Sequence, residues 1–260
     1  MSTAAAKTIA LQDSVVYGPI HSRRLGESLG INLLPLSYKL CSFNCVYCQY
    51  GWTTNKNEKG EKLLSAEELL AVARREMQAF REKGTRVDCM TLAGNGEPTL
   101  HPELGAIIRG LCRLRDEFYP KAVLSILSDS HSVHRPEVRK ALALLDHRYM
   151  KLDAGTPEML QAVNKPMGKM DWNAMFEGLR QLKDTTLQCL FVAGTLDSTA
   201  PAMIEAWIAT VRRIAPIEAQ VYTVSRGTAD PGIRPVSRKR LKEIAELLTH
   251  RTGIPASVYE

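Results

Sequence analysis

The sequence predicts an α/β fold in which parallel strands form a partial (β/α)6 TIM-like barrel. Short apolar runs alternate with amphipathic helical stretches about six times along the chain. No long polar linker, internal repeat or low-complexity tract interrupts this alternation. Strands that alternate with helices form right-handed βαβ units and a parallel sheet. Because a closed eight-fold barrel needs more such units than this chain supplies, an open, partial barrel fits best.

The amino-terminal elements follow from apolar runs and helix-end signals. The run 29–36 is expected to be the first strand. A helix is expected over 65–84, since Ser65 is a good N-cap and Gly84 a good stop. Further strands are expected at 87–94 and 122–128, and helices at 101–118, with Pro102 at its start, and at 135–145.

The carboxyl-terminal half continues the alternation. The patterns predict strands at 149–154, 186–194, 217–224 and 255–259. They predict helices at 156–163, 171–183, 201–214 and 238–249. We expect one domain over residues 1–260, with an amino-terminal segment and first strand (16–36), a core (37–225) and a carboxyl-terminal extension (226–260).

The composition is that of an ordinary globular protein, with 45% hydrophobic and 24% charged residues. No apolar run approaches the length that crosses a bilayer, and the first ten residues are too weakly apolar for a signal peptide. We therefore expect a cytoplasmic protein without a membrane partner. The net charge of +6 favours an anionic partner, although surface charges are usually only solvated. The densest basic cluster, and the candidate for nucleic-acid contact, is "SRKRLK" (237–242).

Three of the six cysteines, Cys41, Cys45 and Cys48, lie within eight positions. One interpretation is a buried helical stripe, because spacings of four and seven share a helix face. Asn44 and Gly51 disfavour a helix here, and a reducing compartment favours metal binding or redox chemistry over disulfides. The spacing therefore predicts a metal site.

The number of thiols indicates which metal. Structural zinc usually takes four protein ligands in two pairs, and ferredoxin-type centres take four cysteines. The other cysteines, Cys89, Cys112 and Cys189, lie in predicted strands or a helix and form no second pair. Three thiolates on a four-iron cluster leave one iron open to a small molecule, as in catalytic metal sites.

Several polar segments follow successive predicted strands. They are "GNGEP" (94–98), "SDSHS" (128–132), "KLDAG" (151–155) and "VAGT" (192–195). Because the carboxyl ends of parallel strands meet at one mouth of a barrel, we expect these segments to gather around the cysteines. Taken alone, the first is typical of a tight turn, and Asp153 is typical of a cap or an ion pair.

The cysteine spacing C-x3-C-x2-C, with Tyr47 before the last cysteine, resembles the signature of the radical S-adenosylmethionine (radical SAM) superfamily. Gly96, Glu97 and Pro98 resemble its glycine–glutamate–proline motif, with Asn95 where a second glycine often stands. Longer segments resemble a subgroup of small proteins akin to the wyosine-forming tRNA enzymes, over most of the chain. They are "VYGPIHSRRLGESLGINLLP", "CVYCQYGWTT", "GNGEPTLHPEL" and "KLDAG".

The resemblance implies a [4Fe–4S] cluster held by Cys41, Cys45 and Cys48, with the amino and carboxylate groups of S-adenosylmethionine (SAM) on its open iron. The reduced cluster would split SAM into methionine and a 5′-deoxyadenosyl radical, which takes a hydrogen atom from the substrate. Electrons would come from an external donor such as flavodoxin or ferredoxin. The substrate stays open among a tRNA base, a peptide and a small molecule.

The resemblance also implies the residues that contact SAM, near the ends of predicted strands. The amino group would meet Gly96 and Glu97, with Gly94 in the same turn. The SAM carboxylate and ribose hydroxyls would meet Lys151 and Asp153. The adenine would meet the backbone near Tyr47 and Ala193, and Ser128 is a further polar candidate.

The chain departs from the subgroup at the expected mouth. Ser128-Asp129-Ser130 replaces the usual threonine–asparagine–glycine, and "SRGTADPGIRP" replaces an arginine–proline–proline run. We expect His131 and His134 to be surface loop residues. Arginines beside the expected open edges indicate an anionic group on the substrate; they are Arg23, Arg24, Arg226, Arg234 and Arg238.

Two other classes of function remain open. One is a non-catalytic iron–sulfur or zinc protein that carries electrons or binds nucleic acid. Glu97 and an open iron disfavour it, since an electron carrier needs no SAM pocket. The other is an activating enzyme that installs a glycyl radical. Such relatives usually have asparagine soon after the last cysteine, where this chain has Gln49-Tyr50-Gly51.

Overall fold

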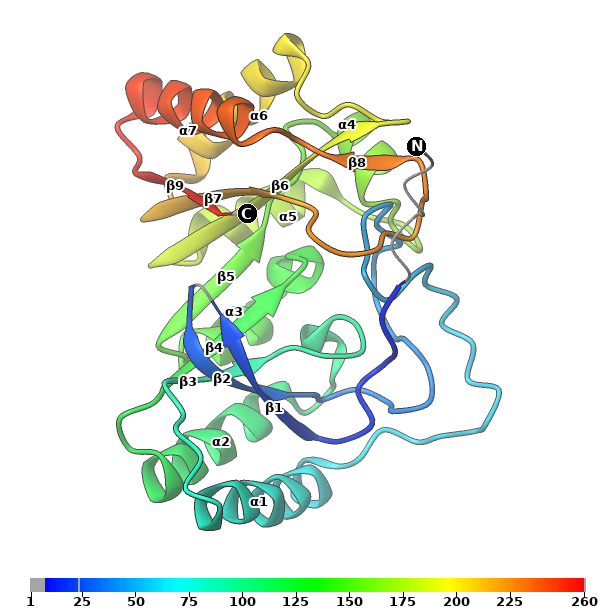
Figure 1. The fold of residues 1–260 in the computed structure, drawn as a ribbon, viewed down its shortest axis with the longest axis vertical. Helices are drawn as coiled ribbons and strands as arrows, with labels where there is room; N and C mark the ends of the chain where they lie inside the picture. Colours follow the sequence, from blue (N-terminus) through cyan, green and yellow to red (C-terminus); the bar gives the residue numbers. More distant parts are fainter. Residues whose placement is uncertain (1–7, 23, 260) are drawn as a thin grey trace.

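The computed structural model describes residues 8–22 and 24–259. Its strands form one curved sheet in the order β1–β2–β3–β4–β5–β6–β7–β9, with β8 paired to β6 (Figure 1). The strands are β1 (Val16–Ser22), β2 (Gly26–Ile31), β3 (Cys89–Leu92), β4 (Val123–Ser128), β5 (His147–Lys151), β6 (Thr185–Gly194), β7 (Glu218–Thr223), β8 (Ile233–Pro235) and β9 (Ala256–Tyr259).

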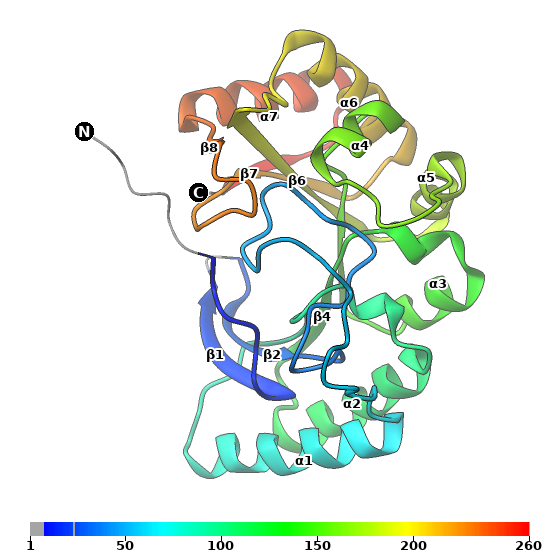
Figure 2. The same ribbon diagram turned by 90° about the vertical axis from the view of Figure 1, so that its right-hand side faces the viewer.

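The helices cover the outer, convex side of this sheet (Figure 2). They are α1 (Ala66–Glu82), α2 (Leu104–Phe118), α3 (Pro136–Leu142), α4 (Pro157–Val163), α5 (Trp172–Gln181), α6 (Pro201–Ile214) and α7 (Arg238–Thr252), with short 3₁₀ helices η1 (Pro98–Leu100) and η2 (His131–His134). Within the described residues, none of the helices has both the length and the apolar character that a bilayer crossing requires.

The helix ends show why these segments are helical. Ser65 caps α1 as predicted: its hydroxyl accepts from the Glu68 N–H, and the Glu68 carboxylate accepts from the Ser65 N–H. Along α1, Leu69, Ala73 and Met77 recur every four residues and are buried. This spacing gives the helix one apolar face, which packs inward while its charged face meets solvent.

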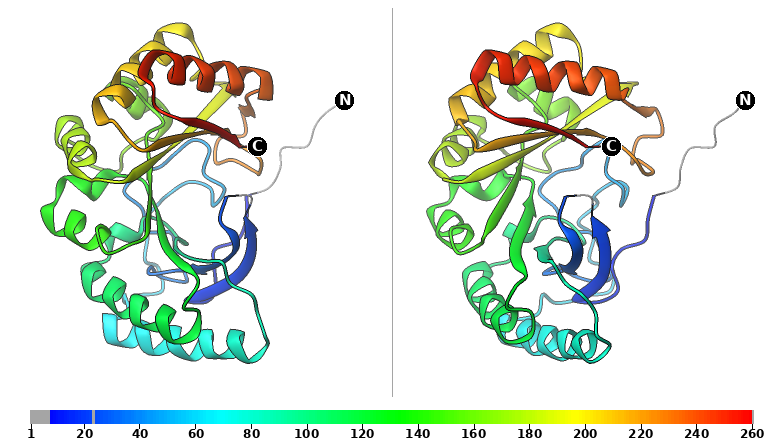
Figure 3. Two further views of the ribbon diagram at one scale, coloured as in Figure 1. Left: turned by 90° about the vertical axis from the view of Figure 1, so that its left-hand side faces the viewer. Right: turned by 60° about the vertical axis from the view of Figure 1, so that its left-hand side comes forward.

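The sheet confirms the predicted partial (β/α)6 barrel. Six consecutive strands, β2 to β7, are parallel neighbours, and β9 adds a further parallel strand beside β7. Strand β1 pairs with β2 in the antiparallel sense. The sheet therefore has two ends, β1 and β9, which Figure 3 shows in blue and red.

Four differences between the structure and the sequence expectations concern missed strands or element ends. The segment Val16–Ser22 is a strand that the apolar pattern missed, because most of its side chains are exposed. The run expected as strand 29–36 ends its pairing at Ile31. Helix α2 begins at Leu104 after Glu103, so Pro102 lies outside it. Strand β8 was missed because it has only three residues, which pair with β6.

Trp207 on α6 joins three parts of the core. Its side chain is fully buried, and its ring packs edge-on against Phe191 of β6 at a centroid distance of 5.1 Å. Its Nε1–H donates to the Leu152 carbonyl oxygen just after β5 (3.1 Å). The indole therefore fixes α6 against the strands that carry the predicted site.

Trp207→Ala is expected to lower the free energy of unfolding by about 3–5 kcal/mol, because it removes a buried aromatic ring and leaves a cavity. Denaturant unfolding followed by circular dichroism measures this loss. Trp52→Ala is the matched control, since Trp52 is 43% exposed. Its loss is expected to be about 1 kcal/mol or less. Equal losses in the two variants would contradict the assignment of Trp207 to the core.

Candidate active site

The cysteine segment is a loop between β2 and α1 that backbone hydrogen bonds hold on two sides. On one side, the Leu40 N–H donates to Asn95 O (2.9 Å) and the Glu97 N–H donates to Leu40 O (3.0 Å). On the other side, the N–H groups of Asn44 and Val46 donate to carbonyl oxygens at the end of α4 (2.9 and 3.0 Å). The segment is not helical, so the interpretation as a helical stripe is wrong.

Gly96 permits the close approach of this loop to the turn after β3. Its φ is +142°, and a Cβ atom there would lie 1.6 Å from the Leu40 carbonyl oxygen. Asn95 beside it is fully buried. Its side-chain Nδ2 donates to the carbonyl oxygens of Gln12 and Pro35 (both 2.9 Å), and its Oδ1 accepts from the Gln12 N–H (2.8 Å). Asn95 thus ties the segment before β1 to the same turn, a role that the sequence did not reveal.

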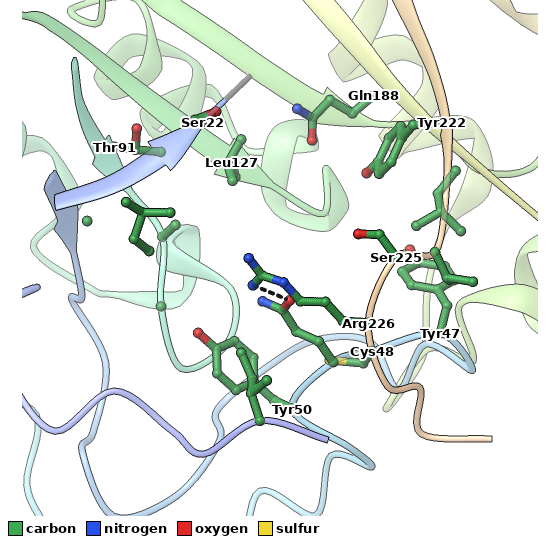
Figure 4. A pocket seen from close by; sticks show the side chains of 18 of the residues that line it. Ser22, Tyr47, Cys48, Tyr50, Thr91, Leu127, Gln188, Tyr222, Ser225 and Arg226 are labelled. Atoms are coloured by element: carbon green, nitrogen blue, oxygen red, sulfur yellow. Dashed lines mark hydrogen bonds between the residues drawn. The ribbon is translucent and has the colours of Figure 1, made fainter. Parts of the chain in front are cut away.

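A cavity of about 500 Å³ lies beside the cysteine loop, with lining residues from the sheet and from the segment after β7 (Figure 4). Six of the predicted site residues line it: Cys41, Tyr47, Cys48, Gly94, Gly96 and Lys151. The other predicted residues, Cys45, Glu97, Ser128, Asp153 and Ala193, are not among the lining residues. A volume of this size suits one or more small ligands.

Two of the three sulfur atoms of the loop have N–H donors aimed at them. Lys39 Nζ donates to Cys48 Sγ (3.0 Å), and Asn164 Nδ2 donates to Cys45 Sγ (3.4 Å). Burial raises the pKa of Cys45 to about 12 and also raises the pKa of Cys41. Both groups are therefore thiols until a metal displaces the proton. Donors aimed at sulfur suit thiolate ligands, so these residues fit the [4Fe–4S] cluster that the signature implies.

The arrangement of the three thiols disfavours a single metal ion as their ligand partner. In the part of the chain that the structure describes, no three His, Cys, Asp or Glu side chains gather as the ligands of one ion. A single zinc ion holds its ligand atoms about 2.0–2.3 Å from one point. A four-iron cluster binds each thiolate through a different iron and so does not need that convergence.

Glu97 and Asp129 form a buried carboxylate pair next to the cysteine loop. Glu97 accepts from the Thr99 N–H (2.9 Å), Ser128 Oγ (2.9 Å) and the Asp129 N–H (2.6 Å). Asp129 lies 3.8 Å from Cys41 Sγ. Burial, with the nearby charge of Asp129, raises the pKa of Glu97 to about 8, and burial also raises the pKa of Asp129. The contact of Glu97 with the SAM amino group stays a prediction.

Asp153 binds four groups from separate segments and is itself buried. Its carboxylate accepts from the Tyr47 hydroxyl, Asn164 Nδ2 (2.8 Å) and the Leu190 N–H (2.9 Å), and Lys151 Nζ lies 3.2 Å away. These bonds fix the cysteine loop against β5 and β6. The expected contact of Asp153 with the SAM ribose stays a prediction.

The remaining predicted residues lie away from the cavity lining. Ala193 pairs with Arg234 in the β6–β8 ladder, so its role beside adenine stays a prediction. His131 packs edge-on against Phe43 of the cysteine loop (5.8 Å between ring centroids), and burial lowers its pKa. Among the described groups, its Nδ1 has no hydrogen-bond partner. His134 Nδ1 contacts the His131 carbonyl oxygen (2.8 Å).

The comparisons with known proteins identify the family. The sequence model of the "Radical SAM superfamily" matches residues 36–205, so the chain belongs to the radical SAM superfamily. It is 34% identical over 165 residues to a UPF0026 protein of Helicobacter pylori, which covers 64% of this chain and 50% of that protein. It is 25% identical over 160 residues to a Danio rerio tRNA 4-demethylwyosine synthase, TYW1, over 55% of this chain and 20% of that protein.

A solved structure shows the same fold. A TYW1 structure with a lysine–pyruvate adduct aligns with a TM-score of 0.60 at 16% identity, over 86% of this chain and 74% of that one. Within the radical SAM superfamily, the chain is thus similar both to UPF0026 proteins and to a wyosine enzyme. The chain spans 35 to 58% of the length of four of its curated relatives.

Gly96→Ala is expected to reduce the iron bound per chain at least severalfold, because the added Cβ displaces Leu40 and with it the neighbouring Cys41. Iron content after anaerobic reconstitution measures this. Gly60→Ala is the matched control: Gly60 also has a positive φ, +65°, but its Cβ would meet nothing within 4 Å. A Gly96→Ala protein with normal iron would show that the close approach is not needed.

The raised pKa of Glu97 predicts a pH effect on the stability of the metal-free protein. The folded chain keeps the Glu97 proton up to a pH of about 8, whereas the unfolded chain releases it near the ordinary value of 4.5. Between these values the folded state binds more protons, so this contribution to the free energy of unfolding falls as the pH rises. The slope is at most about 1.4 kcal/mol per pH unit.

Urea unfolding from pH 5 to 8 tests this. The quantity compared is the free energy of unfolding of wild type and of Glu97→Gln at each pH. The variant cannot lose the proton and is expected to show a flatter profile. Glu117→Gln, at an exposed carboxylate paired with Arg74, serves as the control for a change of charge. Parallel profiles for wild type and Glu97→Gln would contradict the raised pKa.

Proposed function

We propose that the protein is a radical SAM enzyme in which Cys41, Cys45 and Cys48 hold a [4Fe–4S] cluster and SAM binds its open iron. One observation carries the proposal: Cys41 and Cys48 line the same cavity as Tyr47 and the Gly94–Gly96 turn. When bound, the cluster and SAM would supply a 5′-deoxyadenosyl radical that removes a hydrogen atom from a substrate. A cavity that the cysteines share with polar side chains gives that radical and a substrate one place to meet.

The chain's own residues have defined parts in this proposal. Lys39 is buried and donates to Cys48 Sγ, which stabilises the thiolate form of that ligand. Lys151 faces the cavity, where its ammonium suits the SAM carboxylate, and the Tyr222 hydroxyl (2.9 Å) and Asp153 hold it in place. A positive amino group near Glu97 would favour the charged form of that carboxyl.

The cavity also helps to distinguish catalysis from the other two function classes. A protein that only carries electrons needs no cavity beside its cysteines, so this feature favours catalysis. No feature of the described residues specifically favours glycyl-radical activation. None of the six cysteines forms a disulfide, which is compatible with a reducing cytoplasm. An external donor such as flavodoxin or ferredoxin would supply the electrons.

Reconstitution under anaerobic conditions tests the proposal. The wild-type protein is expected to hold about four irons and to form 5′-deoxyadenosine from SAM when reduced. Cys45→Ala is expected to lose both properties. Cys112→Ala is expected to keep them, because Cys112 lies on α2 outside the cavity. A colourless wild-type protein with one tightly bound zinc ion would refute the proposal.

A further inference from the structure

The cavity wall carries positive side chains and lacks negative ones. Arg24, Lys39, Lys151 and Arg226 line it, whereas no Asp or Glu occurs among the described lining residues. Asp153, the carboxylate paired with Lys151, is buried and is not among the lining residues. A cavity lined by one sign of charge concentrates ligands of the opposite sign.

Two of these cations already have partners. Lys39 donates to Cys48 Sγ and to the Gly51 carbonyl oxygen (2.9 Å). Lys151 pairs with Asp153 and is the proposed partner of the SAM carboxylate. SAM itself brings one carboxylate against a sulfonium and an ammonium group, so it does not call for two more cations. Arg24 and Arg226 are therefore left to act on another ligand.

Arg24 crosses the open side of the barrel. It lies between β1 and β2, yet its guanidinium carbon sits 4.9 Å from the ring centre of Tyr222 on β7 and 5.4 Å from that of Tyr259 on β9. These rings hold the guanidinium group in place through cation–π contact. Arg24 thereby connects the two ends of the sheet, which are far apart in the strand order.

The donors of Arg24 are largely unused. Its one side-chain hydrogen bond among the described residues runs from Nη1 to Gln220 Oε1 and is long, at 3.5 Å. No carboxylate of the described residues forms an ion pair with it. A guanidinium group has five N–H donors in a planar fork that matches the oxygens of carboxylate or phosphate. The side chain is therefore held in position for a ligand that the chain does not supply.

Arg226 adds a second cation on the same wall. Its Nη1 donates to the neutral Gln49 Oε1 (3.0 Å), and Figure 4 shows Arg226 beside Tyr50 and Cys48. Because Gln49 is uncharged, the positive charge of Arg226 is not neutralised by this contact. Arg226 therefore adds to the attraction of an anion at the cysteine side of the cavity.

We propose that the cavity binds a small substrate with a carboxylate or phosphate group, and that Arg24 receives this group between Tyr222 and Tyr259. The inference rests on the proposed function and names the class of substrate for it. A small molecule fits better than a nucleic acid, because the unpaired Arg24 fork lines a cavity of limited volume rather than an extended basic surface.

The test uses reconstituted wild-type protein with SAM bound, and two probes, benzoate and phenyl phosphate, which separate carboxylate from phosphate recognition. Isothermal titration measures the affinity for each probe. Wild type is expected to bind at least one of them, and Arg24→Gln is expected to weaken that binding about ten- to a hundredfold. Arg24→Lys keeps the charge but loses the fork, so an intermediate loss is expected.

Arg75→Gln is the matched control, because it removes the same charge at an exposed position of α1 outside the cavity. It is expected to bind the probes as wild type does. Tyr259→Leu removes one of the two aromatic rings that hold Arg24 and is expected to weaken binding severalfold. This variant keeps the test valid if Arg24→Gln does not fold. Thermal unfolding of each variant reports its folding separately.

Three results would overturn the inference. They are no binding of either probe by wild type, equal binding by wild type and Arg24→Gln, and an equal loss in Arg75→Gln. Bulk tRNA that binds through Arg24 while neither small probe does would point to a nucleic acid instead. Formation of 5′-deoxyadenosine by wild type is measured separately. Cleavage without probe binding refutes only this inference, and Arg24-dependent binding without cleavage refutes only the proposed function.

Discussion

The buried carboxylate of Asp153 is the interaction on which the site depends. It accepts from Tyr47 in the cysteine loop, from Asn164 after α4 and from the Leu190 N–H in β6. A buried carboxylate is costly unless such partners compensate for the lost water. If the loop left its place, Asp153 would lose the hydrogen bond from Tyr47, so the buried carboxylate favours the position that keeps the cysteines near the carboxyl ends of the strands.

Asp153 also explains how a positive cavity wall is sustained. Lys151 faces the cavity, and the charge beneath it is Asp153, 3.2 Å away. Buried carboxylates that back exposed cations reduce the repulsion between neighbouring cations on the wall. The negative groups lie within the protein and the positive groups face the ligand space, which favours anions there.

The sequence predicted much of the fold, because each helix and most strands carry a local signal. Apolar period and capping residues such as Ser65 are visible in a short window. Strands β1 and β8 were missed because their pairing partners, rather than their own side chains, make them strands. Their residues are largely exposed or few, so no apolar run indicates them.

The site was predictable to the extent that its residues follow a spacing. Cys41, Cys48 and the glycines of the Gly94–Gly96 turn belong to motifs, and they line one cavity. Two of the partners of Glu97, by contrast, are Ser128 and Asp129, about thirty residues away, and no local pattern indicates such a contact. The same holds for Arg24, whose aromatic partners lie at the other end of the chain. Arg23 was predicted with it but lies outside the described residues.

The structure shows what the residues at one departure from the subgroup, 128–130, contact. Ser128-Asp129-Ser130 was expected at the mouth of the barrel, but all three residues are buried, and none is among the cavity's lining residues. Ser128 and Asp129 instead support Glu97, and Ser130 Oγ donates to the Lys151 carbonyl oxygen (2.8 Å). Substitutions at these three buried positions would therefore affect how the cysteine loop and Glu97 are held. On the proposed function, substrate choice depends instead on side chains that line the cavity, and some of these, such as Arg24 and Tyr259, lie near the two open ends of the sheet. A partial barrel leaves those ends unpaired by strands, so side chains such as Arg24 and Tyr259 can vary there without disturbing the parallel core.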